Sequence, residues 1–221
     1  MSSTRIRRAG RKTGPKPRFT REDVINAAVE LGIDRFTLGA VAAKLGIATS
    51  AMYRLFDSRD ALVDACLAQA AAEIGMIMLD DELPWPELLR NWAETTWNIC
   101  EKYPGLDITI FQYTQSFSHV RGFTQHAMDI LMAQGFARSE ALFALDFIGD
   151  TVLATHIGMS AMRHSPEGMD IVRRTITELS AEILLDNKDH WNAQRGFLDA
   201  KVEFIIAGLR QQLGQRATEK T

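Results

Sequence analysis

Residues 36–62, with the sequence FTLGAVAAKLGIATSAMYRLFDSRDAL, decide the predicted fold. Four apolar residues in this stretch recur at the spacing of one helix face: Leu38, Val41, Ala42 and Leu45. Gly46 follows them, where a helix end favours glycine because glycine reaches the left-handed conformation without strain. A second helix is expected next, with a buried side made of Met52, Tyr53 and Phe56. Two short helices joined by a tight turn fit a helix-turn-helix, whose second helix enters the DNA major groove, although other all-α cores contain the same pattern.

A longer pattern of residues runs through the same stretch. It comprises Thr37, then Ala42-Ala43-Lys44-Leu45-Gly46, Ala51-Met52-Tyr53, Phe56 and Ser58-Arg59-Asp60-Ala61-Leu62. With these matches at fixed spacing, the stretch resembles the DNA-binding domain of the tetracycline-repressor (TetR) family. The resemblance implies an all-α protein with an N-terminal three-helix helix-turn-helix domain and a C-terminal helical domain for ligand binding and dimerisation.

Two positions depart from the family pattern. Ala48 stands where Ser or Thr usually accepts hydrogen bonds from the recognition helix. The missing side-chain cap is expected to lower helix stability by about 1 kcal/mol unless Thr49 caps the helix one residue later. Leu55 replaces a residue, commonly His or Tyr, that touches phosphate, so one backbone contact is expected to be missing.

The composition is that of a globular protein with a real core. The chain has 221 residues, of which 46% are hydrophobic and 24% charged. Cys66 and Cys100 both lie in apolar surroundings, which predicts buried free thiols. No apolar run approaches the length of a membrane span, and the N-terminus lacks the apolar segment of a signal peptide. We therefore expect a cytoplasmic protein that does not contact a membrane.

The charge of the chain is distributed asymmetrically. Residues 1–21 contain eight basic side chains and no acidic one. Because the whole chain has a net charge of −3, the remainder carries −11. We predict that residues 1–18 form a flexible basic arm that adds salt-sensitive phosphate contacts, the alternative being a solvated tail without that role.

Helices are expected throughout, since no stretch alternates with period two over a useful length. The predicted organisation is a helix-turn-helix domain over 19–64, a helical effector-binding and dimerisation domain over 65–214, and a disordered tail over 215–221. Thr20 and Asp23 resemble a capping box at the first helix, and Gly32 ends it. The later helices are expected at 58–78, 86–103, within 106–118, at 120–134, at 139–163 with Ser139 as the cap, at 169–185 and at 189–213.

The last helix carries an apolar stripe that favours a dimer. Its members are Leu198, Val202, Ile205, Leu209 and Leu213. Small residues on the long helix before it, Gly149, Ala154 and Gly158, leave room for a close neighbour. Two such helices from each of two chains build a four-helix bundle, and the alternative is that both stripes are buried inside one monomer.

The body also resembles a tetracycline-repressor-like effector domain. The resemblance rests on Ala133-Gln134-Gly135-Phe136, Glu140-Ala141-Leu142-Phe143-Ala144-Leu145 with Gly149, and Trp85 with Leu89-Arg90-Asn91. It implies a small-molecule cavity enclosed by helices. The positions that serve a magnesium–tetracycline chelate in the family are Gly75, Thr109, Gly158 and Trp92 here, which are unsuited to a metal apart from a weak Thr hydroxyl. We therefore expect neither tetracycline nor a metal, and no cofactor.

The remaining cavity is expected to suit a flat or greasy ligand. Its predicted wall residues are Trp92, Thr96, Thr109, Tyr113, Met128, Leu142, Asp146 and Gly149, each with plain core packing as the alternative. Asp146 needs a partner if it is buried, either a cationic ligand or Arg90 or a neighbouring hydroxyl.

The predicted function is a ligand-responsive, homodimeric DNA-binding regulator, a repressor released from a palindromic operator by a small apolar or aromatic molecule. The predicted DNA-contacting residues are Thr37, Gly39, Thr49, Ser50, Ala51, Tyr53, Arg54, Arg59 and Arg18. No catalytic residues are predicted, because the sequence lacks a Gly-rich phosphate loop, a Gly-x-Ser-x-Gly, a CxxC and a helical His pair. The alternatives are an all-α carrier or enzyme with an incidental helix-turn-helix, and a protein-interaction module.

Overall fold

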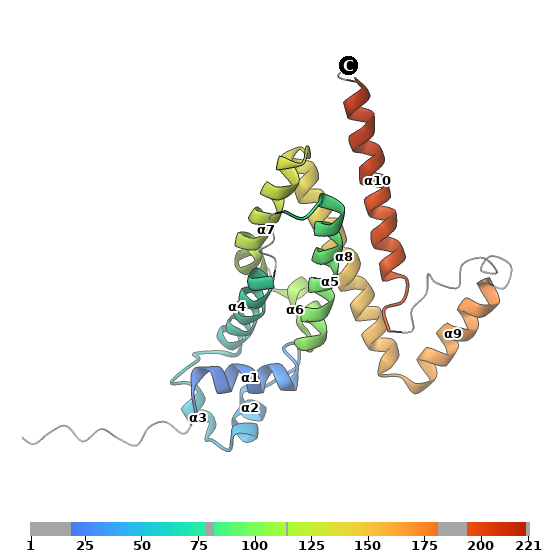
Figure 1. Ribbon diagram of the computed structural model, residues 1–221. Coiled ribbons are helices and arrows are strands. Elements are labelled where there is room, and N and C mark those ends of the chain that lie inside the picture. The colour runs from blue at the N-terminus through green and yellow to red at the C-terminus, as the bar shows by residue number, and fades with distance from the viewer. Residues whose placement is uncertain (1–18, 78–81, 114, 181–193, 220–221) are drawn as a thin grey trace, which may run out of the picture.

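The computed structural model describes residues 19–77, 82–113, 115–180 and 194–219. Over these ranges the regular structure is helical, as predicted (Figure 1). The helices are α1 (Arg21–Leu31), α2 (Leu38–Leu45), α3 (Thr49–Met52), α4 (Arg59–Ile77), α5 (Trp85–Lys102), α6 (Leu106–Gln112), α7 (Ser116–Ala133), α8 (Arg138–Arg163), α9 (Pro166–Ser180) and α10 (Leu198–Glu219).

Helices α1, α2 and α3 form the predicted helix-turn-helix unit at one end of the molecule (Figure 1). The capping box at α1 is present, because the Thr20 hydroxyl accepts from the Asp23 N–H and the Asp23 carboxylate accepts from the Thr20 N–H. The unit closes over fully buried side chains from all three helices and from the loop and turn beside them: Val24, Ala28, Ile33, Val41, Met52 and Phe56. Gly46 is left-handed, as the turn requires.

The recognition helix α3 is shorter than the sequence suggests. It ends at Met52, and the N–H groups of Leu55 and Phe56 both donate to the Met52 carbonyl in a following turn. Ala48 is its N-cap without a side-chain hydrogen bond, and Thr49 already lies inside the helix, so the missing cap is confirmed. The prediction that Tyr53 is buried is wrong, because this turn carries it outward, with 54% of its surface exposed.

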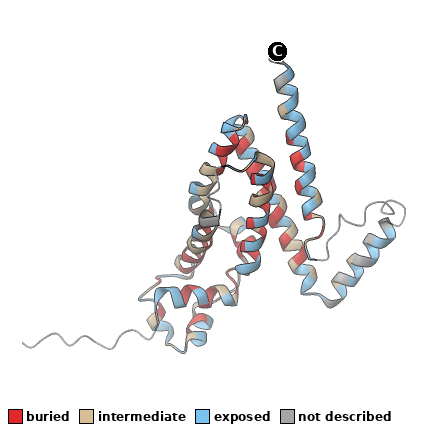
Figure 2. Ribbon diagram, viewed as in Figure 1, coloured by how far each residue is buried: buried red, intermediate tan, exposed pale blue. Residues whose placement is uncertain are grey.

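Helix α4 leads from this unit into the body and runs unbroken through the predicted domain boundary at residues 64 and 65. In the body, α5 and α8 pack along one another, with α7 and α10 beside them (Figure 1). Their inward faces supply one continuous core that includes Leu89, Leu131 and Ile148, whereas the outward faces are exposed (Figure 2). The two sets of helices thus have separate cores joined through α4, α5 and α6.

Several helix starts differ from those predicted. Helix α7 begins at Ser116 rather than residue 120, and α9 begins at Pro166 rather than residue 169. Helix α8 begins at Arg138, so Ser139 is not its cap. Instead the Glu140 carboxylate accepts from the Ala137 N–H and satisfies that end of the helix.

Helix α10 also differs at both ends. Its expected start at residue 189 lies outside the described residues, and Leu198 is its first helical residue. Residues 215–219, predicted to be disordered, continue the helix past Gly214, and the Thr218 hydroxyl donates to the Gln215 carbonyl 2.6 Å away. Residues 220–221 and 1–18, the predicted basic arm with Arg18, lie outside the described residues.

Helix α8 corrects another expectation, because it is long and apolar enough to cross a membrane by length and composition. In the described fold, 39% of its most apolar window is buried. Ala141, Ala144, Leu145 and Ile148 form its inward face. A central helix packed against several neighbours has the same apolar composition.

The apolar stripe on α10 lies inside the monomer. Four of its members are buried in the same core as residues of α5 and α8: Leu198, Val202, Ile205 and Leu209. This is the monomer alternative named above, in which the stripe is not used for dimerisation. The exposed aromatic side chains of α8 and α10 lie outside this core, at Phe143, Phe147 and Phe204. Phe204 has 82% of its surface exposed, and the rings of Phe143 and Phe147 stack 5.5 Å apart.

Candidate nucleic-acid interface and effector site

The predicted DNA-contacting residues of α2 and α3 lie together on the exposed side of the helix-turn-helix unit. Exposed members of this set, which we call the reader surface, are Thr37, Gly39, Thr49, Ser50, Tyr53 and Arg54. Ala51 is half-buried beside them. The reader surface therefore presents hydroxyl groups, an aromatic ring and a guanidinium, which are suitable partners for phosphate oxygens and base edges.

The start of α2 is built for close approach. The Thr37 hydroxyl caps the helix by accepting from the Ala40 N–H at 3.1 Å. A Cβ added at Gly39 would meet nothing nearer than the Thr37 hydroxyl at 4.0 Å, so the backbone there is bare and open. A nucleic-acid backbone placed there would meet no side chain at position 39.

Basic side chains near the reader surface also support its shape. Arg21 donates from Nη1 to the Leu55 carbonyl at 2.9 Å, and its guanidinium lies 4.1 Å from the centre of the Phe56 ring. This contact holds the turn that follows α3. Lys44 pairs with Glu30 at 2.7 Å, which ties α2 to α1.

Arg59 does not belong to the reader surface, contrary to the prediction. Its Nε donates to the Phe36 carbonyl, and its Nη2 donates to the carbonyls of Ile33 and Asp34 at 3.1 and 2.8 Å. Its Nη1 donates to the Tyr113 hydroxyl at 2.7 Å. The guanidinium thus fastens the start of α4 to the α1–α2 loop and to the end of α6.

Tyr113, predicted to line the effector cavity, completes this fastening instead. Its hydroxyl accepts from Arg59 and donates to the Asp60 carboxylate at 3.0 Å. The ring follows the last turn of α6. Because the hydroxyl is already used by two charged groups of α4, the structure gives no support to the predicted ligand contact through this hydroxyl.

Other predicted wall residues lie in ordinary core surroundings. Trp92 and Met128 are buried in the body core, and Trp92 packs 5.6 Å from the Phe123 ring. A Cβ added at Gly149 would lie 3.9 Å from the Trp92 indole nitrogen. The hydroxyls of Thr96 and Thr109 donate to the carbonyls of Trp92 and Gly105 in their own helical turns. These five residues therefore have the surroundings of plain core packing, which is the alternative to a role in the cavity wall.

Leu142 and Asp146 are not wall residues, because both are exposed on the outer face of α8. The helix turns its Ala141, Ala144 and Leu145 side toward the core, and positions 142 and 146 lie on the other side. Asp146 needs no buried partner there.

Two described hollows have charged walls. One of about 710 Å³ lies between α5 and α10, where Arg90 pairs with Glu87 and Glu203, and Arg195 pairs with Glu94. A second of about 540 Å³, which we call the junction pocket, lies between the α1–α2 loop, the ends of α5 and α8, and the start of α6. Neither is lined by the predicted wall residues.

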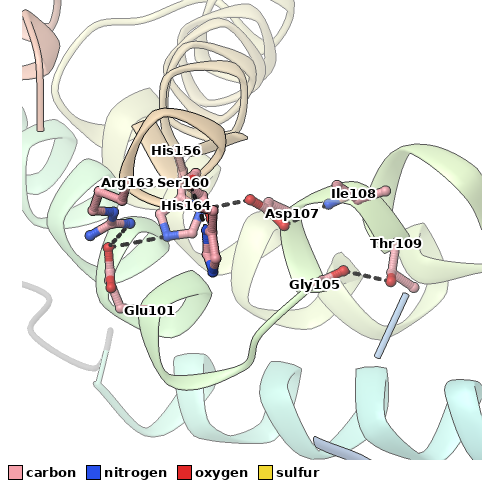
Figure 3. Close-up of polar contacts among 9 residues, drawn as sticks. All are labelled: Glu101, Gly105, Asp107, Ile108, Thr109, His156, Ser160, Arg163 and His164. Atoms are coloured by element: carbon pink, nitrogen blue, oxygen red, sulfur yellow. Dashed lines mark hydrogen bonds and ion pairs between the residues drawn. The ribbon is translucent and has the colours of Figure 1, made fainter. Parts of the chain in front are cut away.

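A buried ion pair that the sequence reasoning missed joins α6 to α8 at the junction pocket. His156 Nδ1 lies 2.6 Å from the Asp107 carboxylate, and both residues are at most 5% exposed (Figure 3). Burial raises the pKa of the Asp107 carboxyl, but hydrogen bonds from His156 and the Ile108 N–H outweigh it, and the pKa lies below its ordinary value. The sequence contained one signal for this pair, because Asp107 is the last charged residue before an apolar segment.

The cysteines are buried and free, as predicted. Burial raises the pKa of the Cys66 thiol to about 12 and raises that of Cys100 as well. Thiols in this state are inert packing groups. Among the described residues, no group of three or more His, Cys, Asp or Glu is arranged to hold a metal ion.

The fold and the reader surface define a helix-turn-helix protein with an all-helical body. Residues 25–66 match the family model described as "Bacterial regulatory proteins, tetR family". Residues 25–66 are therefore similar to the N-terminal segment of that family, and most of the chain shares the fold of solved TetR-family regulators. No curated protein matches the chain by sequence.

Solved structures of TetR-family proteins share this fold. ActR from Streptomyces coelicolor in its apo form is 15% identical, with 91% of this chain and 100% of that chain covered and a TM-score of 0.69. The same protein in complex with actinorhodin is 16% identical, with coverage of 89% and 99% and a TM-score of 0.66. TetR from Acinetobacter baumannii AYE is 20% identical, with coverage of 88% and 98% and a TM-score of 0.60.

Proposed function

We propose that this chain is a transcriptional repressor that binds a palindromic operator as a homodimer and is released by a small apolar or aromatic molecule. The observation that carries the proposal is the reader surface, displayed on a helix-turn-helix segment of the tetR family. Its proposed DNA contacts are Thr37, Gly39, Thr49, Ser50, Ala51, Tyr53 and Arg54. Arg59 is left out because its donors are used inside the protein.

A second copy is proposed to pack on the outer faces of α8 and α10. Phe147 and Phe204 line a shallow apolar groove there with Thr151 and Ile205. Exposed aromatic side chains on two neighbouring helices are a surface that a partner helix pair covers. A two-fold axis at this face would place two reader surfaces on successive turns of one duplex.

The released state is proposed to follow entry of the effector beside Trp92 and Met128 in the body core. Solved structures with this fold hold actinorhodin in one case and, in a TetR variant, minocycline. A ligand that favours one arrangement of α4 and α6 shifts the spacing of the two reader surfaces. DNA binding then weakens by the coupling free energy between the ligand site and the DNA site. We propose a cytoplasmic location, where the chromosome lies.

The test is fluorescence anisotropy of the full chain with labelled DNA from upstream of its gene, repeated at several salt concentrations. Binding should be tight and should weaken steeply as salt rises, because phosphate contacts release counterions. Tyr53→Ala should lower the affinity at least tenfold while the circular dichroism spectrum stays the same.

Phe117→Ala is the matched control, since Phe117 is an exposed aromatic residue of α7, remote in sequence from the reader surface. It should bind DNA as the unchanged chain does. Equal affinities for the Tyr53→Ala variant and the unchanged chain would refute the proposed surface.

A further inference from the structure

The folded helix-turn-helix unit has little positive charge for a surface that meets DNA. Residues 19–64 contain seven acidic and five basic side chains, which gives a net charge of −2. Residues 1–18, the basic arm, contain seven basic side chains and no acidic one. Binding to a polyanion depends mainly on the cations that reach its phosphates. The affinity therefore depends on how many of the five cations in the folded unit are free to do so.

Four of these five cations have partners inside the protein. Arg21 donates to the Leu55 carbonyl, and Arg59 is surrounded by backbone and tyrosine oxygens. Lys44 is paired with an acidic side chain of α1. Arg35 donates to a carbonyl of α1 and lines the junction pocket together with residues of the body. These four side chains thus serve the fold.

Arg54 is the exception among the described residues 19–64. Its side chain is exposed on the reader surface and makes no hydrogen bond or ion pair there. Asp57, exposed in the turn that follows, adds a negative charge nearby. A dimer therefore offers two unpaired cations from the described parts of its two folded units. Because each phosphate contact contributes about −0.9 to the slope of log affinity against log salt, these two cations account for a slope of only about −2.

The basic arm joins the folded unit at the edge of the reader surface. Arg21 begins α1, and its hydrogen bond to the Leu55 carbonyl links that start to the turn after α3 (Figure 1). The seven cations of the arm occupy residues 5–18. A chain of this length spans at most about 50 Å, which exceeds one turn of duplex DNA at about 34 Å. The phosphates that flank each half-site are therefore within reach of the arm.

We propose that the basic arm supplies most of the phosphate contacts of the DNA complex, through residues 5–18 on the duplex beside each half-site. The sequence alone predicts an added contribution, and the internal use of the folded cations makes it the main one. The reader surface selects the operator, and the arm provides the charge that holds the complex together. This role of the arm rests on the proposed operator binding.

The experiment measures operator affinity of the full chain by fluorescence anisotropy at several salt concentrations. One variant combines Arg5→Gln, Arg7→Gln and Arg8→Gln, which removes six cations from a dimer. The slope of log affinity against log salt should become shallower by at least about 3, out of the about 5 that six phosphate contacts allow. At about 150 mM salt the affinity should fall at least tenfold.

Two control variants separate this role from a general effect of charge. Arg121→Gln, Arg138→Gln and Arg174→Gln together remove the same number of charges from exposed positions of α7, α8 and α9, and they should leave the slope unchanged. Arg54→Gln should make the slope shallower by at most about 2. In the arm variant, the ratio of affinities for operator and scrambled DNA should stay within about twofold, since phosphate contacts carry no sequence information.

The outcomes distinguish the role of the arm from the proposed function. An arm variant with the slope of the unchanged chain would overturn the role of the arm, whereas operator binding that is lost in Tyr53→Ala would still support the repressor. An equal change in the body variant would reveal a general charge effect and overturn it as well. A fall in the operator ratio would also overturn it, because the arm would then read bases. A full chain without affinity for DNA from upstream of its gene would overturn both proposals.

Discussion

Arg59 is the residue whose position most changes the interpretation of the helix-turn-helix motif. The family pattern places a basic residue at the start of the fourth helix, and the sequence suggested a phosphate contact. The fold instead surrounds its guanidinium with three backbone carbonyls and the Tyr113 hydroxyl. A planar group with donors in a fixed fork suits this role, and a lysine ammonium does not.

Arg59→Lys therefore tests whether the residue acts through the fold. Loss of several charge-assisted hydrogen bonds should lower the free energy of unfolding by about 2 kcal/mol. Arg54→Lys, on the exposed reader surface, should change it by less than about 0.5 kcal/mol. Urea denaturation measures both. Unchanged stability of Arg59→Lys together with weaker DNA binding would restore the phosphate role.

Gly105 is a second residue whose identity the fold requires. Its φ is +82°, and a Cβ there would collide with the Asp34 carboxylate and the Asp34 N. Gly105→Ala should destabilise the chain by more than about 1 kcal/mol, because an L side chain in the left-handed region is strained even without the collision. The measurement is again denaturation.

Gly122 provides the matched control for this substitution. It lies inside α7 with nothing within 4 Å of an added Cβ. Gly122→Ala should stabilise the chain by about 0.5–1 kcal/mol, since glycine weakens a helix interior. Equal destabilisation by both substitutions would contradict the geometry at Gly105.

At the scale of elements, the Asp107–His156 pair joins α6 to α8 and makes stability depend on pH. The pKa of Asp107 in the folded chain lies below its ordinary value of 3.8. Its contribution is therefore complete above that value and is lost as the pH falls through the lower folded pKa. Asp107→Asn should cost about 3 kcal/mol at pH 7, because it leaves His156 without its closest charge partner.

The cost of Asp107→Asn should shrink as the pH is lowered below about 4, where the unchanged chain also loses the ionised pair. Denaturant titrations from pH 7 to pH 3 measure this difference. For the control Glu167→Gln, at an exposed position on α9, the difference in free energy of unfolding from the unchanged chain should stay the same over this pH range. A cost that stays constant down to pH 3 would mean that Asp107 is not held ionised by the pair.

At the scale of the whole molecule, the proposed dimer depends on the outer faces of α8 and α10. Phe204→Asp removes an aromatic ring that is 82% exposed in the single chain, so the fold of the monomer should persist. The variant should be monomeric by light scattering and should bind the operator at least tenfold more weakly. Phe111→Asp, at an exposed position on α6, should stay dimeric.

A Phe204→Asp variant that still formed dimers would place the subunit contact on another face. A monomeric variant that kept full affinity for a palindromic operator would show that DNA binding does not require the dimer.

The sequence alone determined the all-α class, the capping box at Thr20, the missing cap at Ala48 and the helix-turn-helix of α2 and α3, because each depends on residues a few positions apart. Tertiary structure alone decided that Arg59 and Tyr113 face each other, that Asp107 meets His156, and that the α10 stripe is buried inside the monomer. The physical reason is the same in each case. A helix pattern shows which residues share a face, but only the packing of distant helices decides whether that face meets solvent, another element or a charged partner.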